Sequence, residues 1–535
     1  MTAEPFADLL AGRASDDRPG LLFEGRTWSW REYVEEARSA ASWLDAFGRP
    51  LHAAVLGDNS PGLLFLIGAA ALSEHVVVAL NPTRSVAELE RDARATRTDL
   101  VLWDEPYGEA AREVAQALGV PHCRMSEARD PGEPKSAPGE LVMLIFTSGT
   151  SGRPRAVRIT QRKLAVPGTN LAALLGADDA VYCSMPLFHS GALMAAFSPA
   201  VASGARLVVR RRFSASAVLP DVREHGCTYL HYVGKALSYV LATPEQPGDA
   251  DGPLKIAFGN EGGATAVRRF GERFGCYVID AFGSTETAIS ITPDPSGPKG
   301  CLGRLPEGVE IRDPATGRRS ATAIIEHGRL ANPDEAIGEL VNVQGMGLFD
   351  GYFEDEEADR ERIRDGAFWS GDLAYADADG FVFFAGRGSE RLRVDGENLA
   401  VAPIEAVLRE FEGVVEAAVY PVPDAAAGDQ VMAALVLAAP FDPGAFQDFL
   451  AGRKDLGSKA IPRYIRVCGE LPQTPSNKVL KRHLVSDAWL TEDPIWVRDG
   501  GYRRLTARDR EAIHADFVRQ GRQHLLESAG GFQSG

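Results

Sequence analysis

The sequence predicts an α/β protein in which a large N-terminal domain of several subdomains precedes a smaller α+β C-terminal domain. Its 535 residues are enough for roughly three or four units of domain size. Through the first 140 residues, short apolar runs alternate with segments of helical length, which is typical of a layered α/β domain. After Arg387 a shorter set of helices and apolar runs follows, which indicates a compact module of its own.

Turn residues, helix caps and apolar runs place the elements of the large domain. Residues 21–23 and 27–28 flank the turn Glu24-Gly25, so they predict a hairpin. Ser29 and Glu32 have the spacing of a capping box, and a helix is therefore expected from there through Leu44. Further strands are expected at the next apolar runs, which are 53–56, 76–80 and 100–103.

The C-terminal module can be read in the same way. Two strands are expected at 414–422 and 431–438, and two helices at 403–411 and 446–450. A last helix, capped by Thr506, is expected over 506–527. The expected division is a large domain at 1–386, a hinge at 387–390, the small domain at 391–500 and a helical tail at 501–535.

Composition places the chain among soluble globular proteins and disfavours one kind of partner. Hydrophobic residues make up 45% of the chain and charged residues 24%, which excludes wholesale disorder. Because 74 Asp and Glu outnumber 57 Lys and Arg, the net charge is −17, and so acidic a surface repels a nucleic-acid backbone. We therefore expect small-molecule substrates and no nucleic acid.

Cysteine spacing and the apolar runs indicate the compartment. The six cysteines are scattered without a CxxC pair, so they predict no zinc or redox site and fit a reducing compartment. Two acidic residues precede the first apolar run, which argues against a secretory signal. The longest apolar stretch, 63–72, has about half the length of a membrane span. We expect a cytoplasmic protein with at most peripheral membrane contact.

A loop of hydroxyls and glycines follows the apolar run 141–146. It reads Thr147-Ser148-Gly149-Thr150-Ser151-Gly152, and an alternating strand is expected after it at 156–159. Glycines let the backbone approach an oxyanion closely, while hydroxyls and exposed N–H groups supply hydrogen-bond donors. The loop lacks the GxxxxGK[ST] pattern of a Walker A motif, and a hairpin turn alone requires fewer such residues. The sequence therefore predicts a phosphate-binding loop.

This loop resembles the phosphate-binding signature of the adenylate-forming superfamily, which includes acyl-CoA synthetases, luciferases and peptide-synthetase adenylation domains. The usual signature ends in Pro-Lys-Gly, whereas this chain has Pro154-Arg155-Ala156, which keeps a cation but changes its shape. Further segments similar to the family follow in the family's order, at 186–191, 259–261, 280–286, 370–373, 386–387 and 472–481. The resemblance implies the adenylate-forming fold, with a mobile C-terminal domain.

The resemblance implies a site for ATP and Mg²⁺. It assigns adenine stacking to Phe282 and ribose binding to Asp372, whose two carboxylate oxygens can accept from both hydroxyls. Thr150 and Glu286 are expected to hold Mg²⁺, a hard cation that prefers oxygen ligands. The implied nucleotide-binding residues are Thr147, Ser148, Gly149, Thr150, Ser151, Gly152, Gly259, Asn260, Glu261, Asp280, Phe282, Gly283, Ser284, Thr285, Asp372, Arg387 and Lys478.

The same resemblance implies the catalytic and acyl-binding groups. Lys478 corresponds to the family's final lysine, whose ammonium can draw a carboxylate and the α-phosphate together. The implied catalytic residues are Lys478, Glu286, Thr150 and His189, and the implied hinge residue is Ser389. The acyl group is expected to lie against His189, Ala192, Leu193, Tyr232, Val233 and Gly234.

Within the superfamily, the chain is most similar to the very-long-chain acyl-CoA synthetases and fatty-acid transport proteins, through residues 210–216, 231–234, 259–260, 393–400 and 501–505. The implied activity is an ATP-dependent acyl-CoA synthetase that converts a long-chain or bulky polycyclic acid into its coenzyme A thioester through an acyl-adenylate. Transfer to an amine or to a carrier-protein thiol stays open as an alternative. A non-catalytic nucleotide or lipid binder is also open, because of the Arg155-Ala156 departure, and so is a homodimer.

Arginines border the apolar run 207–209. Arg206 opens it, and Arg210, Arg211 and Arg212 follow it directly. A solvated strand end is the simplest interpretation of these cations. The alternative is a patch for the phosphates of CoA or for an anionic membrane surface.

Overall fold

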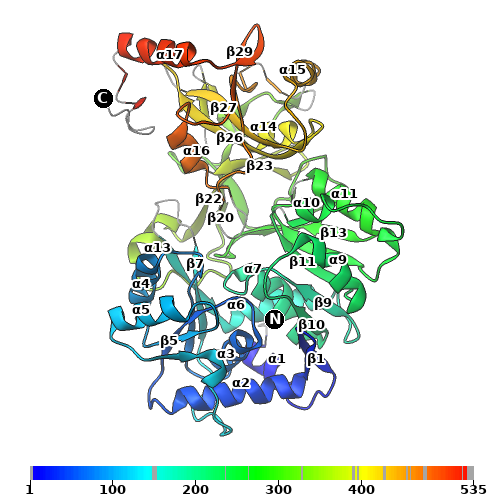
Figure 1. The fold of residues 1–535 in the computed structure, drawn as a ribbon, viewed down its shortest axis with the longest axis vertical. Helices are drawn as coiled ribbons and strands as arrows, with labels where there is room; N and C mark the ends of the chain where they lie inside the picture. Colours follow the sequence, from blue (N-terminus) through cyan, green and yellow to red (C-terminus); the bar gives the residue numbers. More distant parts are fainter. Residues whose placement is uncertain are drawn as a thin grey trace. The chain divides into compact units, whose positions relative to one another are not determined.

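The chain folds into two compact units (Figure 1). Unit 1 comprises residues 1–262, 266–290 and 344–368, and unit 2 comprises 263–265, 291–343 and 369–535. The structure, a computed structural model, describes residues 4–147, 154–234, 236–262, 264–326, 329–387, 392–394, 397–399, 401–425, 429–453, 456–457, 459–473, 479–520, 522–523 and 525–526.

The first 291 residues supply most of unit 1. Their strands are β1 (Pro19–Phe23), β2 (Arg26–Ser29), β3 (His52–Leu56), β4 (Val76–Ala79), β5 (Leu100–Trp103), β6 (His122–Arg124), β7 (Leu141–Thr147), β8 (Arg155–Thr160), β9 (Ala180–Cys183), β10 (Arg206–Val209), β11 (Tyr229–Val233), β12 (Ile256–Asn260), β13 (Tyr277–Asp280), β14 (Phe282–Gly283) and β15 (Ser290–Ile291). Their helices are α1 (Phe6–Ala11), α2 (Trp30–Asp45), α3 (Pro61–Ala71), α4 (Val86–Ala95), α5 (Gly108–Leu118), α6 (Gln161–Ala172), α7 (Ser190–Ala192), α8 (Ser198–Ser203), α9 (Ala215–Glu224), α10 (Ala236–Leu241) and α11 (Ala264–Phe274), with short helical turns η1 (Met125–Glu127), η2 (Leu193–Phe197) and η3 (Asp249–Asp251).

One sheet of unit 1 has the strand order β6-β5-β3-β4-β7-β8 and is covered on both faces. Alternate side chains of β3 fall into two separate cores: Ala54 and Leu56 lie in the core that also holds residues of α4 and α5, whereas Ala53 and Val55 lie in the core of α2 and α3. A strand with two buried faces reads as a continuous apolar run. The expected strands at 53–56, 76–80 and 100–103 are therefore confirmed as β3, β4 and β5.

The apolar stretch 63–72 forms most of α3, a helix buried on all sides. Residues 63–71 are all buried, and the side chain of Ser60 caps the helix by accepting from the backbone N–H of Leu63. A Cβ at Gly68 would lie 2.8 Å from Cβ of Ala37, so the glycine allows α3 to pack closely on α2. Among the described residues, no helix has the length and apolarity needed to cross a bilayer.

The second sheet of unit 1 has the order β13-β12-β11-β9-β10-β1-β2. Strands β11, β12 and β13 run parallel, with Tyr232 in register with Gly259 and Gly259 in register with Asp280. Parallel strands end at the same edge of a sheet, and ligands commonly bind beyond such an edge. The fold thus gathers three segments predicted to bind ligands, 231–234, 259–261 and 280–283, at one edge.

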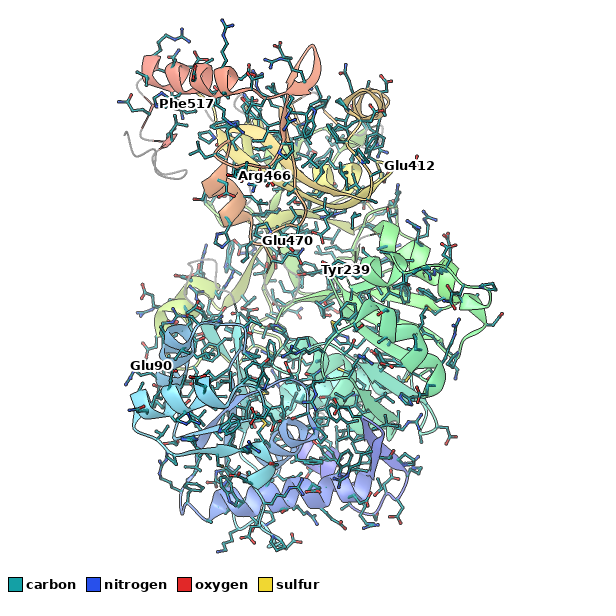
Figure 2. All side chains as sticks on the ribbon, viewed as in Figure 1. Glu90, Tyr239, Glu412, Arg466, Glu470 and Phe517 are labelled. Atoms are coloured by element: carbon teal, nitrogen blue, oxygen red, sulfur yellow. The ribbon has the colours of Figure 1, made fainter. Side chains whose placement is uncertain are left out.

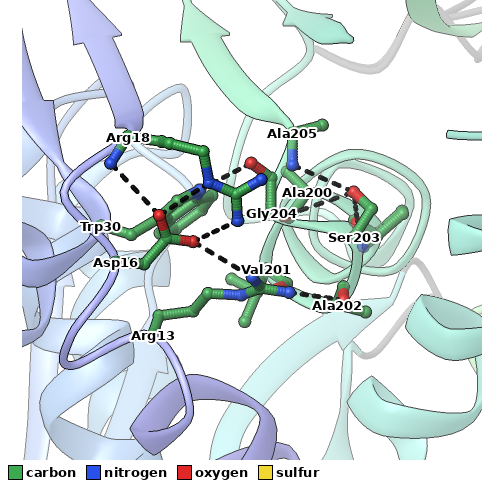
Figure 3. A network of polar contacts seen from close by, with 11 residues as sticks. Arg13, Asp16, Arg18, Trp30, Ala200, Val201, Ala202, Ser203, Gly204 and Ala205 are labelled. Atoms are coloured by element: carbon green, nitrogen blue, oxygen red, sulfur yellow. Dashed lines mark hydrogen bonds and ion pairs between the residues drawn. The ribbon is translucent and has the colours of Figure 1, made fainter. Parts of the chain in front are cut away.

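A polar network ties the N-terminal segment to the end of α8 (Figure 3). Arg13 donates to the carbonyl oxygens of Val201 and Ala202 at 2.7 Å each, and so satisfies two of the carbonyls that a helix end leaves without partners. Asp16 accepts from Arg18 at 2.6 and 2.8 Å and from Arg13 at 3.1 Å. These bonds lower the pKa of Asp16 to about 2, with the Arg18 bond as the largest cause.

We expect Asp16→Asn to lower the free energy of unfolding by about 1–2 kcal/mol at pH 7. The pKa of Asp16 is depressed in the folded state, so its contribution is fully present above pH 4 and is lost as the pH falls toward 2. Chemical denaturation of the two proteins measures the difference. The matched control is Asp17→Asn, because the Asp17 side chain is 76% exposed and its pair with Arg31 contributes little. Equal losses in both variants would contradict the prediction.

Unit 2 contains two larger sheets, of orders β16-β23-β22-β20-β17 and β26-β27-β28-β29-β30. The remaining strands are β16 (Gly303–Arg304), β17 (Val309–Arg312), β18 (Ile325–Glu326), β19 (Arg329–Leu330), β20 (Gly338–Asn342), β21 (Ile363–Arg364), β22 (Ala367–Ala376), β23 (Phe381–Arg387), β24 (Leu392–Val394), β25 (Glu397–Leu399), β26 (Val414–Pro423), β27 (Asp429–Leu437), β28 (Tyr464–Val467), β29 (Ile495–Asp499) and β30 (Gly501–Arg504). The remaining helices are α12 (Pro333–Ala336), α13 (Glu356–Arg362), α14 (Val401–Leu408), α15 (Pro443–Ala451), α16 (Lys481–Asp487) and α17 (Ala507–Arg519). Of these later elements, α13 and β21 belong to unit 1.

The C-terminal sheet is also covered on both faces. Even-numbered residues of β26, such as Tyr420, pack with α16 and with Phe517 of α17, whereas odd-numbered ones, such as Val419, pack with α14 and α15. Figure 2 marks Phe517 on α17 and Arg466 on β28. The two strands expected here are confirmed, but the expectation of only two was wrong, because β28, β29 and β30 extend the sheet.

Helix bounds differ from expectation at both ends. The helix expected from Ser29 is confirmed as α2, with both bonds of the capping box formed. Helix α14 begins two residues before the expected 403 and ends three residues before 411, and α17 ends at Arg519 rather than at 527. The division at 387–390 stays a prediction, because residues 388–391 lie outside the described ranges.

Candidate active site

The predicted phosphate loop joins β7 to β8, which pair antiparallel with Thr147 opposite Arg155. The strand expected after the loop is thereby confirmed. Of the predicted loop residues, Thr147 ends β7, whereas residues 148–153, and Thr150 among them, lie outside the described residues.

The predicted nucleotide segments meet around Asp280. Its Oδ1 accepts from the Tyr232 hydroxyl at 2.8 Å and from the backbone N–H of Gly262 at 2.9 Å. Burial raises the pKa of this carboxyl. Tyr232, expected to line the acyl site, is 1% exposed, and its hydroxyl connects β11 to the end of β13. No local motif indicates this contact, since 48 residues separate the two side chains.

In two turns beside these segments, a residue other than glycine has a left-handed backbone conformation. Glu261, which follows β12, has φ +61°, and Thr287, which follows Glu286, has φ +56°. Such backbone is uncommon outside glycine, and it persists where the surrounding contacts determine it. The Thr285 hydroxyl also lies 3.0 Å from that of Ser190, which connects the 282–286 segment to the one containing His189.

Glu286 is held through its main chain and through its side chain. Its Oε1 accepts from the Tyr352 hydroxyl at 2.9 Å, and its carbonyl oxygen accepts from Nζ of Lys163 at 2.9 Å. Burial acts to raise the pKa of Glu286, but its own backbone N–H and the Tyr352 hydroxyl hold that pKa below its usual value. A carboxylate that stays ionised while half-buried fits a role as a ligand of a hard cation.

The family's Pro-Lys-Gly position is occupied by a buried arginine. Arg155 is 6% exposed, pairs with Glu361, and has its guanidinium 5.4 Å from the ring centre of Tyr352. A planar guanidinium can both pair with a carboxylate and lie over an aromatic ring, which an ammonium does less well. The arginine in this chain therefore supports the tyrosine that bonds to Glu286.

Two imidazoles of unit 1 are neutral at physiological pH. Burial lowers the pKa of both His189 and His231 to about 4. His231 is 2% exposed, and its Nδ1 bonds to the carbonyl oxygen of Phe258 at 3.1 Å, so Nδ1 carries the hydrogen and Nε2 is an acceptor. A Cβ at Gly191 would lie 3.1 Å from this Nε2, which brings the predicted acyl segments 189–193 and 231–234 together.

The other predicted acyl residues are largely buried. Ala192 and Leu193 are fully buried, Val233 is half-buried, and Gly234 donates its backbone N–H to the carbonyl oxygen of Asn260 at 2.8 Å. Gly234 has φ +57°, a conformation that glycine adopts without strain.

The arginines after β10 are neutralised by nearby carboxylates. Arg210 pairs with Asp221 at 2.7 Å, Arg211 with Glu24 at 2.8 Å and Arg212 with Asp58 at 2.9 Å. Because each guanidinium already has an anionic partner, these contacts favour the solvated strand end over a phosphate patch.

Asp372 and Arg387 lie opposite each other in unit 2, on the paired strands β22 and β23. Asp372 is 6% exposed, and its backbone N–H donates to the Ser370 hydroxyl at 3.1 Å. The sheet thus brings together two residues that are 15 positions apart in the sequence. Ser389 lies outside the described residues.

Lys478 also lies outside the described residues, but its flanks are described. Gln473 and Val479 form an antiparallel bridge on either side of the segment 474–478. Just beyond, Nζ of Lys481 pairs with Oε1 of Glu405 at 2.8 Å, so α16 is fastened to α14. The described residues on either side of 474–478 are therefore held by a strand bridge and by an ion pair.

The sequence matches the AMP-binding enzyme family over residues 10–353 and the AMP-binding enzyme C-terminal domain over residues 403–478. The chain therefore belongs to the adenylate-forming superfamily of AMP-binding enzymes. It is 43% identical to a steroid-22-oyl-CoA synthetase of Rhodococcus jostii, over 97% of this chain and 98% of that one. It is 44% identical to a medium/long-chain-fatty-acid–CoA ligase of Mycobacterium marinum, over 93% and 100%. Within the superfamily these relatives place it among the acyl-CoA synthetases, which confirms the predicted family.

Solved structures and a further relative agree. The O-succinylbenzoate coenzyme A synthetase of Bacillus subtilis, in complex with AMP, has a TM-score of 0.74 at 25% identity and covers 90% of this chain and 98% of its own. The ATP-bound MatB of Rhodopseudomonas palustris has a TM-score of 0.79 at 24% identity, with the same coverage. Long-chain fatty acid transport protein 5 of Mus musculus is 30% identical over 67% of this chain and 55% of its own. The predicted adenylate-forming fold is confirmed.

Proposed function

We propose that this protein is an AMP-forming acid–thiol ligase that activates a hydrophobic carboxylic acid with ATP and transfers the acyl group to coenzyme A. The observation that carries the proposal is the similarity, at 43–45% identity over at least 90% of the chain, to CoA ligases of steroid and medium- or long-chain fatty acids. The acid is accordingly a long chain or a bulky polycycle. Because these relatives are named for CoA, they favour CoA over an amine or a carrier-protein thiol as acceptor.

The reaction has two displacement steps. A carboxylate oxygen of the acid attacks the α-phosphorus of ATP, the bond to the bridging oxygen breaks, and pyrophosphate leaves. The sulfur of CoA then attacks the acyl carbonyl carbon, AMP leaves with the electron pair, and the thiol proton is released. Neither step requires a covalent enzyme intermediate, so catalysis depends on alignment and charge neutralisation.

We propose that Glu286 and Thr150 are the two protein ligands of the Mg²⁺ of MgATP. The half-buried, ionised carboxylate fits this ion, and among the described residues no group of three His, Cys, Asp or Glu forms a metal site by itself. Phosphate oxygens and water would then complete the shell, as is usual for Mg²⁺. The Bacillus subtilis relative was also solved in complex with ATP and magnesium ion. When bound, the ion neutralises phosphate charge.

The remaining roles follow the family motifs. We assign charge neutralisation at the α-phosphate to Lys478, acyl contact to His189, adenine stacking to Phe282 and ribose binding to Asp372. Because burial keeps His189 neutral, it presents an uncharged ring to the acyl group. We place the hinge at Ser389.

ATP–pyrophosphate exchange with a panel of acids tests the proposed function. We expect exchange that requires Mg²⁺ and a hydrophobic acid, with rates rising from short to long fatty acids or to a steroid carboxylate. Added CoA should yield the thioester and AMP in equal amounts. Thioester formed only on a carrier protein, or amide formed with an amine, would correct the acceptor. Absence of exchange with every acid, in protein that is folded by circular dichroism, would contradict the proposal.

A further inference from the structure

Lys163 is a cation placed where the protein excludes water. It lies in the first turn of α6 and is 0% exposed. An ammonium buried without a bonded carboxylate loses its hydration and recovers only part of that free energy. Among the described residues, the Lys163 ammonium donates one hydrogen bond, at 2.9 Å, to the carbonyl oxygen of Glu286, which is 123 residues further along the chain.

The local structure fixes the direction of this side chain. Thr160 caps α6 by accepting from the backbone N–H of Lys163, and its hydroxyl donates to Asp350 at 2.7 Å. The ring of Phe349 lies 5.8 Å from the ammonium nitrogen. The cap at one end and the ring beside the ammonium direct Nζ at the turn that contains Glu286.

The other end of Glu286 is held from a different part of unit 1. Tyr352 is 2% exposed, donates its hydroxyl to Oε1 of Glu286 at 2.9 Å, and lies under the guanidinium of Arg155. The next residue, Thr287, has left-handed backbone with φ +56°. Because main chain and carboxylate have separate anchors, the strained turn and the side chain are both fixed.

We propose that Lys163 and Tyr352 are positioning residues that hold Glu286 in the orientation in which its carboxylate binds the Mg²⁺ of MgATP. The inference rests on the proposed function, of which the role of Glu286 is a part. Mg²⁺ demands near-ideal ligand geometry, and residues behind a ligand commonly set its orientation. Without the ammonium, the peptide carbonyl of Glu286 loses its partner, the turn relaxes, and the carboxylate leaves the position that the metal requires.

The test measures the binding of the α,β-methylene analogue of ATP by calorimetric titration, once in Mg²⁺ and once in EDTA. The ratio of the two affinities is the Mg²⁺-dependent gain, and it is determined for each protein. We expect Lys163→Met to reduce the gain about tenfold and to leave binding in EDTA within about twofold. The matched control is Lys255→Met, because Lys255 is 68% exposed on the surface of unit 1, and we expect it to behave as wild type.

A double-mutant cycle separates positioning from general damage. If Lys163 acts through Glu286, then Lys163→Met adds no further loss in the Glu286→Gln background. Independent, additive losses would overturn the inference. Tyr352→Phe removes only a hydroxyl, and we expect it to reduce the gain about threefold in wild type and not at all in the Glu286→Gln background. It also serves as the test if Lys163→Met fails to fold.

The outcomes distinguish this inference from the proposed function. If wild-type protein does not bind the analogue, the proposed function fails. If Mg²⁺ strengthens binding equally in wild type and in Glu286→Gln, the assignment of Glu286 fails. If Glu286→Gln loses the gain while Lys163→Met and Tyr352→Phe keep it, the positioning inference alone is overturned.

Discussion

Replacing Lys478 by alanine will lower acid-dependent ATP–pyrophosphate exchange by about 10²–10³-fold, the effect typical of losing one group that stabilises transition-state charge. The attacking carboxylate and the α-phosphate are both anionic, and an ammonium between them offsets their repulsion as the new bond forms. Its contribution is larger in the transition state than in the ground state, so kcat should fall more than KM changes.

The control must separate the loss of this ammonium from the loss of any lysine. Lys255→Ala changes an exposed lysine that pairs with Asp179, and it should leave exchange unchanged. A second measurement supplies the enzyme with preformed acyl-adenylate and CoA. Because Lys478 acts in the first displacement, Lys478→Ala should form thioester at nearly the wild-type rate. Undiminished exchange in Lys478→Ala would contradict the assigned role.

Local sequence rules predicted the elements whose signals are local. The bonds of a capping box join residues three apart, so Ser29 and Glu32 sufficed to predict the start of α2. The strands β3, β4 and β5 were predictable because burial on both faces makes each one uniformly apolar. Family motifs likewise located the loop between β7 and β8, whereas the role that they imply for Glu286 stays a prediction.

The strands that were not predicted, β28, β29 and β30, contain charged residues at positions where a strand pattern requires apolar ones. Strand β28 contains Arg466 (Figure 2), which is 8% exposed. Arg466 bonds to Asp487 at 2.9 Å and to Asp493 at 2.7 Å. A buried arginine is stable there only because both partners are present, and neither lies in the strand itself. No four-residue window could therefore identify β28.

The supporting residues of the site could not be predicted for a related reason. Lys163 and Tyr352 lie 123 and 66 residues from Glu286 in the sequence, and neither belongs to a motif that names Glu286 as partner. From the sequence alone, a lysine in the first turn of a helix is expected to be exposed to solvent. Only the fold, which places the Glu286 carbonyl beside its ammonium, shows that Lys163 is buried.

Lowering the pH from about 6.5 to 4 will destabilise unit 1 through His231, by about 3 kcal/mol in total. Burial lowers the pKa of His231 to about 4 in the folded state, whereas a histidine in an unfolded chain takes up its proton near pH 6.5. In this window the unfolded state binds more protons, so stability falls as the pH falls. His231 therefore lowers the free energy of unfolding by about 1.4 kcal/mol for each pH unit of acidification.

His231→Asn isolates this contribution. The asparagine amide nitrogen can replace Nδ1 as donor to the Phe258 carbonyl oxygen, but it cannot take up a proton. Thermal midpoints measured from pH 7.5 to 4.5 should fall less steeply in His231→Asn than in wild type. His122→Asn is the control, since His122 is an exposed residue of β6, and it should keep the wild-type slope. Equal slopes in wild type and His231→Asn would mean that the imidazole is protonated in the folded protein, which is incompatible with a buried, unprotonated Nε2 beside Gly191.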